Sequence, residues 1–209
     1  MYLLRTQLYH LYLGQEPVLP TTGGMTDTRP QPINVPRGSN ATYGPVPRED
    51  QLFCIEGLAV APTPIVVDSF FFVLLRGQIE KSGPTAGSEI QDADLASATL
   101  DITISTADAD GQVDEPWTVT IPLLTTTWRP DAHIAIRDKD GAHVEQLTTD
   151  GSNDILADMS LLSTFTHTGV WTFQFVARLA DDRCLFAISL TQYLKGGIEQ
   201  PPAPRVPVS

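Results

Sequence analysis

The stretch from Trp171 to Leu179 constrains the fold more than any other part of the chain, because its side chains alternate between apolar and polar. Every odd-numbered residue in it is apolar, and the even-numbered residues are polar apart from Val176. Successive side chains of a β-strand point to opposite faces, so this pattern predicts a strand with one buried face. We expect Trp171, Phe173 and Phe175 to point together into the core.

A hairpin is predicted directly after this strand. Residues 180–183, Ala-Asp-Asp-Arg, have the composition of a turn, and an apolar run follows at 184–190. A second turn is predicted at Asp138–Gly141, which would join a strand at 133–137 to one at 143–147.

Two further segments, 100–104 and 117–121, alternate in the same way. Residues 154–162 are the segment that favours a short helix, since acidic and apolar residues are mixed there without strict alternation. Short strands separated by turns predict a mainly β protein. The spacing argues for an antiparallel sandwich or barrel, and we expect the β-sandwich to span residues 51–197.

Both ends of the chain are rich in proline. Seven of the 17 prolines lie between residues 14 and 50, where they exclude helices and central strands. Residues 1–50 therefore read as an apolar segment followed by an extended arm, and residues 198–209 as a short Pro-rich tail. A long stretch without secondary structure is typically functional, and we expect the arm to bind neighbouring subunits. The expected partner-binding residues are Pro30, Pro32, Ile33, Val35, Tyr43, Val46 and, in the body, Trp128.

The charge of the chain argues against several kinds of partner. It has 25 acidic and 13 basic residues, a formal net charge of -12, and the first 50 residues carry equal numbers of both signs. Nucleic-acid binding needs a basic surface, and anionic membranes repel an acidic one, so neither is an expected partner. The chain has no apolar stretch of membrane-spanning length and no recognisable export signal near Met1, so we expect assembly in a cytoplasm.

The densest acidic cluster offers a weak calcium candidate. Asp108, Asp110 and Asp114 alternate in a Gly-containing loop, although the spacing does not match an EF-hand. A solvated turn is the other interpretation of the same residues. His133 and His143 flank the predicted hairpin and would need a third ligand, such as Asp131, to hold a metal.

No motif in the sequence indicates catalysis. A nucleophile elbow, a phosphate loop and a zinc-protease helix are all missing from the sequence, so neither an enzyme nor a cofactor is expected. Cys54 and Cys184 both lie in apolar runs, which favours buried free thiols over a disulfide.

The segment Gly169–Ala177, with the Asp-Asp turn and the return strand, resembles the closing hairpin of immunoglobulin-like sandwiches. Such domains are common in decoration and baseplate proteins of tailed bacteriophages and in bacterial surface modules. The antibody framework itself is not matched, because Asp182 stands where its conserved tyrosine would be, and Cys54 and Cys184 are too far apart for its usual pair.

This resemblance implies an immunoglobulin-like or jelly-roll-like β-sandwich and, together with the arm, a virion structural protein. The expected role is a capsid decoration (cement) protein, or another head or tail component, that oligomerises with copies of itself or binds the major capsid protein. The alternative is a module that binds carbohydrate or a host surface through Trp117, Trp128 or Trp171. A hydrolase is the third possibility.

Overall fold

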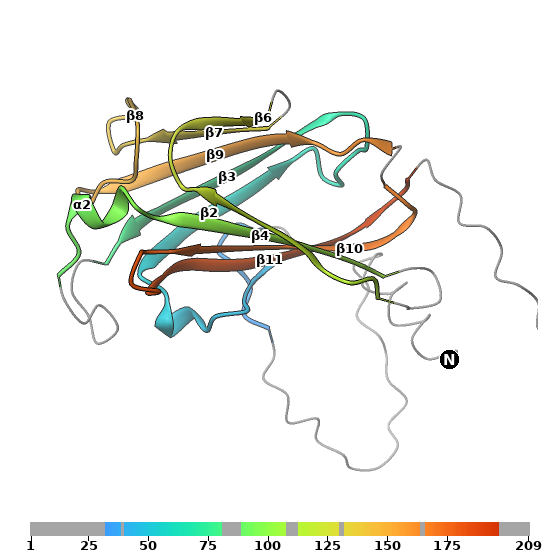
Figure 1. The fold of residues 1–209 in the computed structure, drawn as a ribbon, viewed down its shortest axis with the longest axis horizontal. Helices are drawn as coiled ribbons and strands as arrows, with labels where there is room; N and C mark the ends of the chain where they lie inside the picture. Colours follow the sequence, from blue (N-terminus) through green and yellow to red (C-terminus); the bar gives the residue numbers. More distant parts are fainter. Residues whose placement is uncertain are drawn as a thin grey trace, which may run out of the picture.

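The computed structural model describes residues 32–38, 40–80, 89–107, 113–129, 132–163 and 166–196. Its strands form two antiparallel sheets packed face to face, which is the β-sandwich that the alternating segments predict (Figure 1). Among the described residues, no helix combines the length and apolar character needed to cross a membrane.

Sheet A has the strand order β1-β11-β10-β4-β5. Its centre is the predicted hairpin, formed by β10 and β11, with β4 on the other side of β10. The strand bounds are β1 Ala41–Tyr43, β4 Thr99–Ala107, β5 Trp117–Pro122, β10 Gly169–Arg178 and β11 Cys184–Leu194.

Sheet B has the order β2-β3-β9-β7-β6, and β8 pairs with β7. The turn expected at Asp138–Gly141 joins β7 to β8, where Ile136 is opposite Val144. The bounds are β2 Phe53–Ala61, β3 Phe70–Ile79, β6 Thr126–Arg129, β7 Ala132–Arg137, β8 His143–Val144 and β9 Ser152–Ser160. Short helical turns occur at η1, Arg48–Asp50, and at α2, Asp92–Leu95.

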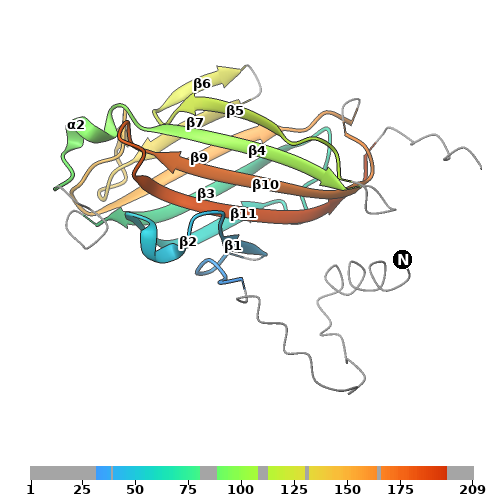
Figure 2. The ribbon, with the colours of Figure 1, turned by 60° about the horizontal axis from the view of Figure 1, so that its bottom comes forward.

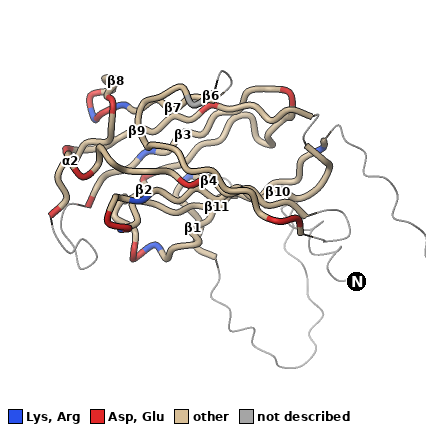
Figure 3. The backbone as a smooth tube through the Cα atoms, in the orientation of Figure 1, with Lys and Arg blue, Asp and Glu red and all other residues tan. Residues whose placement is uncertain are grey.

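The core lies between the sheets and contains the residues expected there. Trp171, Phe173 and Phe175 are all buried, and the ring centroids of Phe173 and Phe71 lie 6.5 Å apart across the two sheets. Figure 3 shows that Asp and Glu gather in turns and at strand ends, which leaves the middles of the strands largely uncharged.

The helix expected at 154–162 is wrong, because most of this segment is β9. β9 lies between β3 and β7, and Ile155 is opposite Leu75 on one side and Ile136 on the other. Hydrogen bonding to a strand on each side outweighs the weak helical preference of the local sequence.

The boundary expected at residue 50 falls inside the packed body. Strand β1 pairs with β11 as the edge strand of sheet A (Figure 2). Val35 is only 2% exposed and belongs to the core. The side-chain nitrogen of the buried Gln51 donates to the Ala187 carbonyl at 3.1 Å, and its side-chain oxygen accepts from the Ala187 backbone amide at 3.1 Å. Residues 33–38 and 40–52 therefore include side chains and a strand that pack on the body.

Candidate functional site

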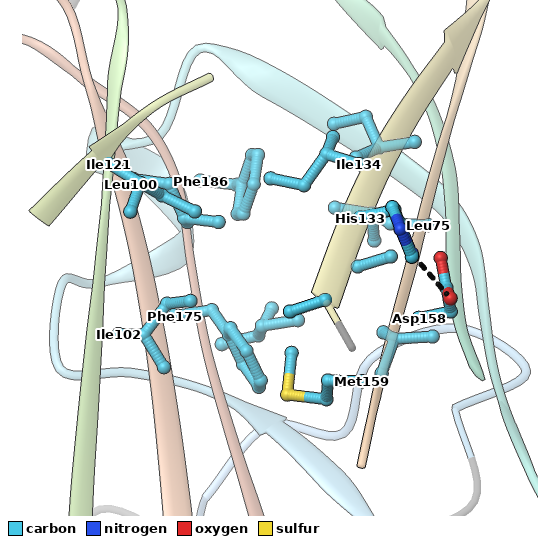
Figure 4. A pocket seen from close by; sticks show the side chains of 15 residues that line it. Leu75, Leu100, Ile102, Ile121, His133, Ile134, Asp158, Met159, Phe175 and Phe186 are labelled. Carbon is cyan, nitrogen blue, oxygen red and sulfur yellow. Dashed lines mark hydrogen bonds and ion pairs between the residues drawn. The ribbon is translucent and has the colours of Figure 1, made fainter. Parts of the chain in front are cut away.

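A small space between the two sheets is lined almost entirely by apolar side chains (Figure 4). Phe175 and Phe186 reach it from sheet A, and Leu75 and Met159 from sheet B. Its volume of about 40 Å³ is far below that of ordinary ligand pockets, which occupy ~300–1,000 Å³. It is a gap in the packing of the core and not a binding site in itself.

His133 and Asp158 lie at the margin of this space and contact each other (Figure 4). The His133 Nδ1 atom is 3.0 Å from the Asp158 Oδ2 atom, and both side chains are partly exposed. His143 is opposite Arg137, at the far end of β7 from His133. The hairpin therefore does not bring His133 and His143 together.

A much larger cleft, of about 490 Å³, opens at one end of the sandwich. Strands β4, β5, β9 and β10 contribute to it, together with the segments that follow β9 and precede β5 and β10. The surface of its lining is mainly apolar. The lining residues are Ile102, Ile104, Thr106, Asp114, Glu115, Trp117, Met159, Ser160, Leu161, Leu162, Thr166, His167 and Trp171.

Two tryptophans differ sharply in how they line the cleft. Trp171 is buried, and its Nε1 donates to the His167 carbonyl at 3.1 Å, so it is a fixed part of the wall. Trp117 begins β5 and is 53% exposed, although it is a large aromatic side chain. An exposed indole beside an apolar cleft is a surface on which a ligand can stack.

The polar side of the cleft is organised around Asp114. Its Oδ2 accepts from the Thr106 hydroxyl at 2.7 Å, and the Asp114 amide donates to the Thr106 carbonyl at 2.9 Å. The His167 Nε2 lies 3.6 Å from the same Oδ2, too far for a hydrogen bond, and is shielded from solvent. The His167 ring packs on Trp171, with centroids 5.3 Å apart.

The segment 161–163, along the other side of the cleft, is held by Asp68. The Asp68 amide donates to the Leu161 carbonyl and its Oδ1 accepts from the Ser163 amide, both at 2.8 Å. Hydrogen bonds from Ser163 lower the pKa of the Asp68 carboxyl below its usual value. The Thr166 hydroxyl donates to the Leu162 carbonyl at 2.8 Å, which fixes the next turn of the chain.

The cleft and the small interior space share part of their lining. Ile102 and Met159 line both of them. Methionine is unbranched and adapts its shape readily, and Met159 lies between the cleft and the small interior space. The cleft is therefore adjacent to the apolar core.

Of the calcium candidates, the structure describes only Asp114; Asp108 and Asp110 lie outside the described residues. Asp114 faces Thr106 and His167, as given above. Asp131 also lies outside the described residues. In the described part of the chain, no group of three or more His, Cys, Asp or Glu side chains is arranged to hold a metal ion.

The expected partner-binding residues separate into exposed and buried ones. Pro32 is exposed, as is Ile33 at 58%, whereas Val35 is a core residue. Tyr43 packs against the same core, with the Arg48 guanidinium 5.7 Å from its ring, and Val46 packs on the outer side of sheet A. These last three side chains contact their own body, which leaves Pro32 and Ile33 available to a partner. Pro30 and the side chain of Trp128 lie outside the described part.

Both cysteines are free thiols in the structure. Cys54 lies in β2 and is partly buried, and Cys184 begins β11. Burial raises the pKa of the Cys184 thiol to about 11, which suppresses the reactive thiolate at neutral pH. Cys184 is thus an inert packing residue.

A second unusual surface is the outer face of sheet B. Phe70, Phe72 and Leu74 alternate along β3 and are all exposed on the side away from the core. Large apolar side chains grouped on a soluble surface typically mark a contact with another molecule.

No family model matches this chain, and no curated protein matches it. A similar solved structure is that of a Niemann-Pick type C2 protein from the Japanese carpenter ant, with 10% sequence identity and a TM-score of 0.42. The alignment covers 69% of this chain and 94% of that one. At this level of similarity we carry nothing over from that protein, and the fold assignment rests on the two sheets themselves.

Sequence reasoning singled out Trp117, Trp171 and Asp114 separately but did not place them at one site. It missed His167, Met159 and the segment 161–163. The pairing that brings them together, in which the end of β4 lies beside the start of β10, is long-range and has no local signal in the sequence.

Proposed function

We propose that this chain is a non-catalytic binding protein that receives the apolar part of a small amphipathic molecule in the cleft. The observation that carries the proposal is the exposed Trp117, which lines a cleft of about 490 Å³ that reaches the core at Met159. Ligand pockets in proteins are mainly apolar, of this size, and carry a few polar groups that orient the ligand. Asp114, Glu115 and His167 supply such groups at one side.

A neutral amphiphile tests this function. Decyl maltoside, kept below its micelle concentration, should bind the full-length chain, change its tryptophan fluorescence and raise its melting temperature. Trp117→Ala and Leu162→Asp should each weaken binding about tenfold or more, because both side chains line the cleft and are exposed.

Phe72→Ala is the matched control, since it removes an exposed aromatic ring from the outer face of sheet B, which does not line the cleft. It should leave the affinity unchanged. Loss of binding in Phe72→Ala, with full binding in Trp117→Ala, would move the site to the outer face of sheet B and overturn the proposal.

A structural role in an assembly is the second candidate, and the exposed face of β3 favours it. Phe70, Phe72 and Leu74 offer an apolar surface to a neighbour, and the exposed Pro32 and Ile33 add possible contacts. The more specific form of this proposal, a virion component of tailed bacteriophages such as a capsid decoration protein, rests on the hairpin Gly169–Ala177 and its resemblance to phage sandwiches.

Light scattering of the full-length chain over a range of concentrations tests self-assembly. Phe72→Asp should shift the mass towards the monomer, whereas Leu162→Asp, an equal change in the cleft, should not. A wild-type chain that stays monomeric at every concentration would remove the support for assembly with copies of itself.

A further inference from the structure

We propose that the cleft selects amphiphiles whose polar head is positively charged, an organic ammonium group above all. This inference rests on the proposed function, because it specifies the head group of the ligand that the cleft would receive. Three features of the described residues support it: the charge of the cleft, the position of its aromatic ring, and the arrangement around Asp114.

The carboxylates of the cleft are not balanced by Lys or Arg among its described lining residues. Asp114 and Glu115 line it, together with His167. The sequence from Leu100 to Trp128 contains no Lys, Arg or His. The chain as a whole carries a net charge of -12, so its field attracts cations and repels anions.

The aromatic ring next to these carboxylates suits a cation as well as an apolar group. Trp117 lies two positions after Glu115 and presents an exposed indole to the cleft. Tryptophan is the aromatic side chain that attracts cations most strongly, and ammonium groups are recognised by such faces in combination with carboxylates. A neutral sugar can stack on the same ring, but it gains nothing from the two negative charges.

The contacts of Asp114 hold its carboxylate in place at the side of the cleft. The Thr106 hydroxyl and the His167 Nε2 approach the same oxygen, Oδ2, at 2.7 and 3.6 Å. Thr106 is uncharged, and its hydrogen bond orients the carboxylate. The side chain of Asp114 is 67% exposed, so its charge is accessible from the mouth of the cleft. The Trp171 Nε1 donates to the His167 carbonyl, so this indole N–H does not point at the head group of a ligand as a free donor.

Three amphiphiles with the same tail test the inference on the full-length chain. Decyltrimethylammonium, decyl maltoside and decanoate are titrated below their micelle concentrations at low ionic strength, with calorimetry or tryptophan fluorescence as the readout. We expect the ammonium compound to bind about tenfold more tightly than the maltoside, and decanoate more weakly than both. Added salt should narrow these differences, since it screens the charges.

The double variant Asp114→Asn with Glu115→Gln keeps the shape of both side chains and removes their charges. It should lower the affinity for decyltrimethylammonium to that for the maltoside and leave maltoside binding unchanged. The matched control, Asp140→Asn with Glu145→Gln, removes the same total charge from exposed positions in sequence segments that do not line the cleft. It should preserve most of the preference for the cation.

The possible results separate this inference from the proposed function. Equal binding of the three amphiphiles would leave the proposed function intact and overturn the preference for a cation. Tightest binding of decanoate would do the same. Binding of the maltoside together with tail-free maltose, but not of the ammonium compound, would indicate carbohydrate recognition and overturn the inference. Binding of none of them would overturn both proposals.

Discussion

The two ends of the sandwich differ in how tightly their side chains pack between the sheets. At the closed end, defined by α2, Leu123 and Leu147, side chains fill the space between the sheets, and Leu147 is 0% exposed. At the open end, defined by the cleft, Leu162 is 46% exposed and Trp117 is exposed as well. Figure 1 shows α2 at the opposite end of the sheets from the start of β10.

The closed end is also tied together by hydrogen bonds between segments far apart in the sequence. The Asp92 carbonyl accepts from the Gln146 side chain at 2.7 Å, and its carboxylate accepts from the Thr149 amide at 2.8 Å. The Leu123 amide donates to the Ala98 carbonyl at 2.9 Å. The sandwich is thus tightly packed at one end and has an exposed apolar lining at the other. The residues that stabilise the closed end are different from those that line the cleft.

The largest expected difference between the ends comes from removing one leucine at each. Leu147→Ala should lower the free energy of unfolding by about 2–5 kcal/mol, because it opens a cavity in a fully packed site. Leu162→Ala should change it by no more than ~0.5 kcal/mol, since that side chain is already half exposed. Denaturant unfolding measures both, and similar losses would show that the open end is packed as tightly as the closed one.

A smaller difference is expected from buried polar side chains. The side-chain oxygen of Asn153 accepts from the backbone amide of Thr148 at 2.8 Å, and its side-chain nitrogen donates to the Thr148 carbonyl at 2.9 Å. Asn153→Ala should therefore lower the free energy of unfolding by about 1–3 kcal/mol. Thr166→Ala, at the open end, removes a single hydrogen bond to Leu162 and should cost about 1 kcal/mol. Denaturant unfolding measures the loss of free energy of unfolding in both variants. A larger loss in Thr166→Ala than in Asn153→Ala would contradict the prediction that the closed end is the more stabilised one.

The smallest effect is a local one of pH at the open end. Hydrogen bonds from the Ser163 side chain and amide lower the pKa of the Asp68 carboxyl below its ordinary value of 3.8. The stabilisation from these bonds is therefore fully present above pH 3.8 and is lost as the pH falls through the lowered pKa. The protection factor of the Ser163 amide against hydrogen exchange should therefore fall in acid. In Asp68→Ala, which removes the accepting oxygen, it should already be low at neutral pH. Exchange at Thr148, at the closed end, serves as the control and should not follow this titration.

Much of the fold was predictable because the strands of the hairpin, β10 and β11, carry their own pattern. Trp171, Phe173 and Phe175 share a face that any pairing must bury, so the local sequence is enough. For β9 the local sequence was misleading, since Asp154 and Asp158 lie four residues apart as on a helix. Pairing with β3 decides that segment, and such long-range pairing is not visible in a window of a few residues.

The candidate site was less predictable for a related reason. Trp117 and Trp171 are conspicuous in the sequence, but Met159 and His167 look ordinary there. They become part of one cleft only because β4 and β9 end where β10 begins. The proline content of residues 14–50 was similarly misleading: proline excludes long strands but not the three-residue strand β1 or the buried side chain of Val35.

The contact between Gln51 and Ala187 has a consequence for the order in which the protein folds. These residues are separated by 136 positions, and β1 pairs with the same late strand, β11. During synthesis Gln51 and β1 leave the ribosome long before β11 exists. They stay unpaired while the middle of the chain is made. Structures dominated by such distant pairings fold slowly, and their intermediates expose unpaired strand edges. The hydrogen bonds of Gln51 and β1 to β11 can therefore form only after almost the whole body has been synthesised.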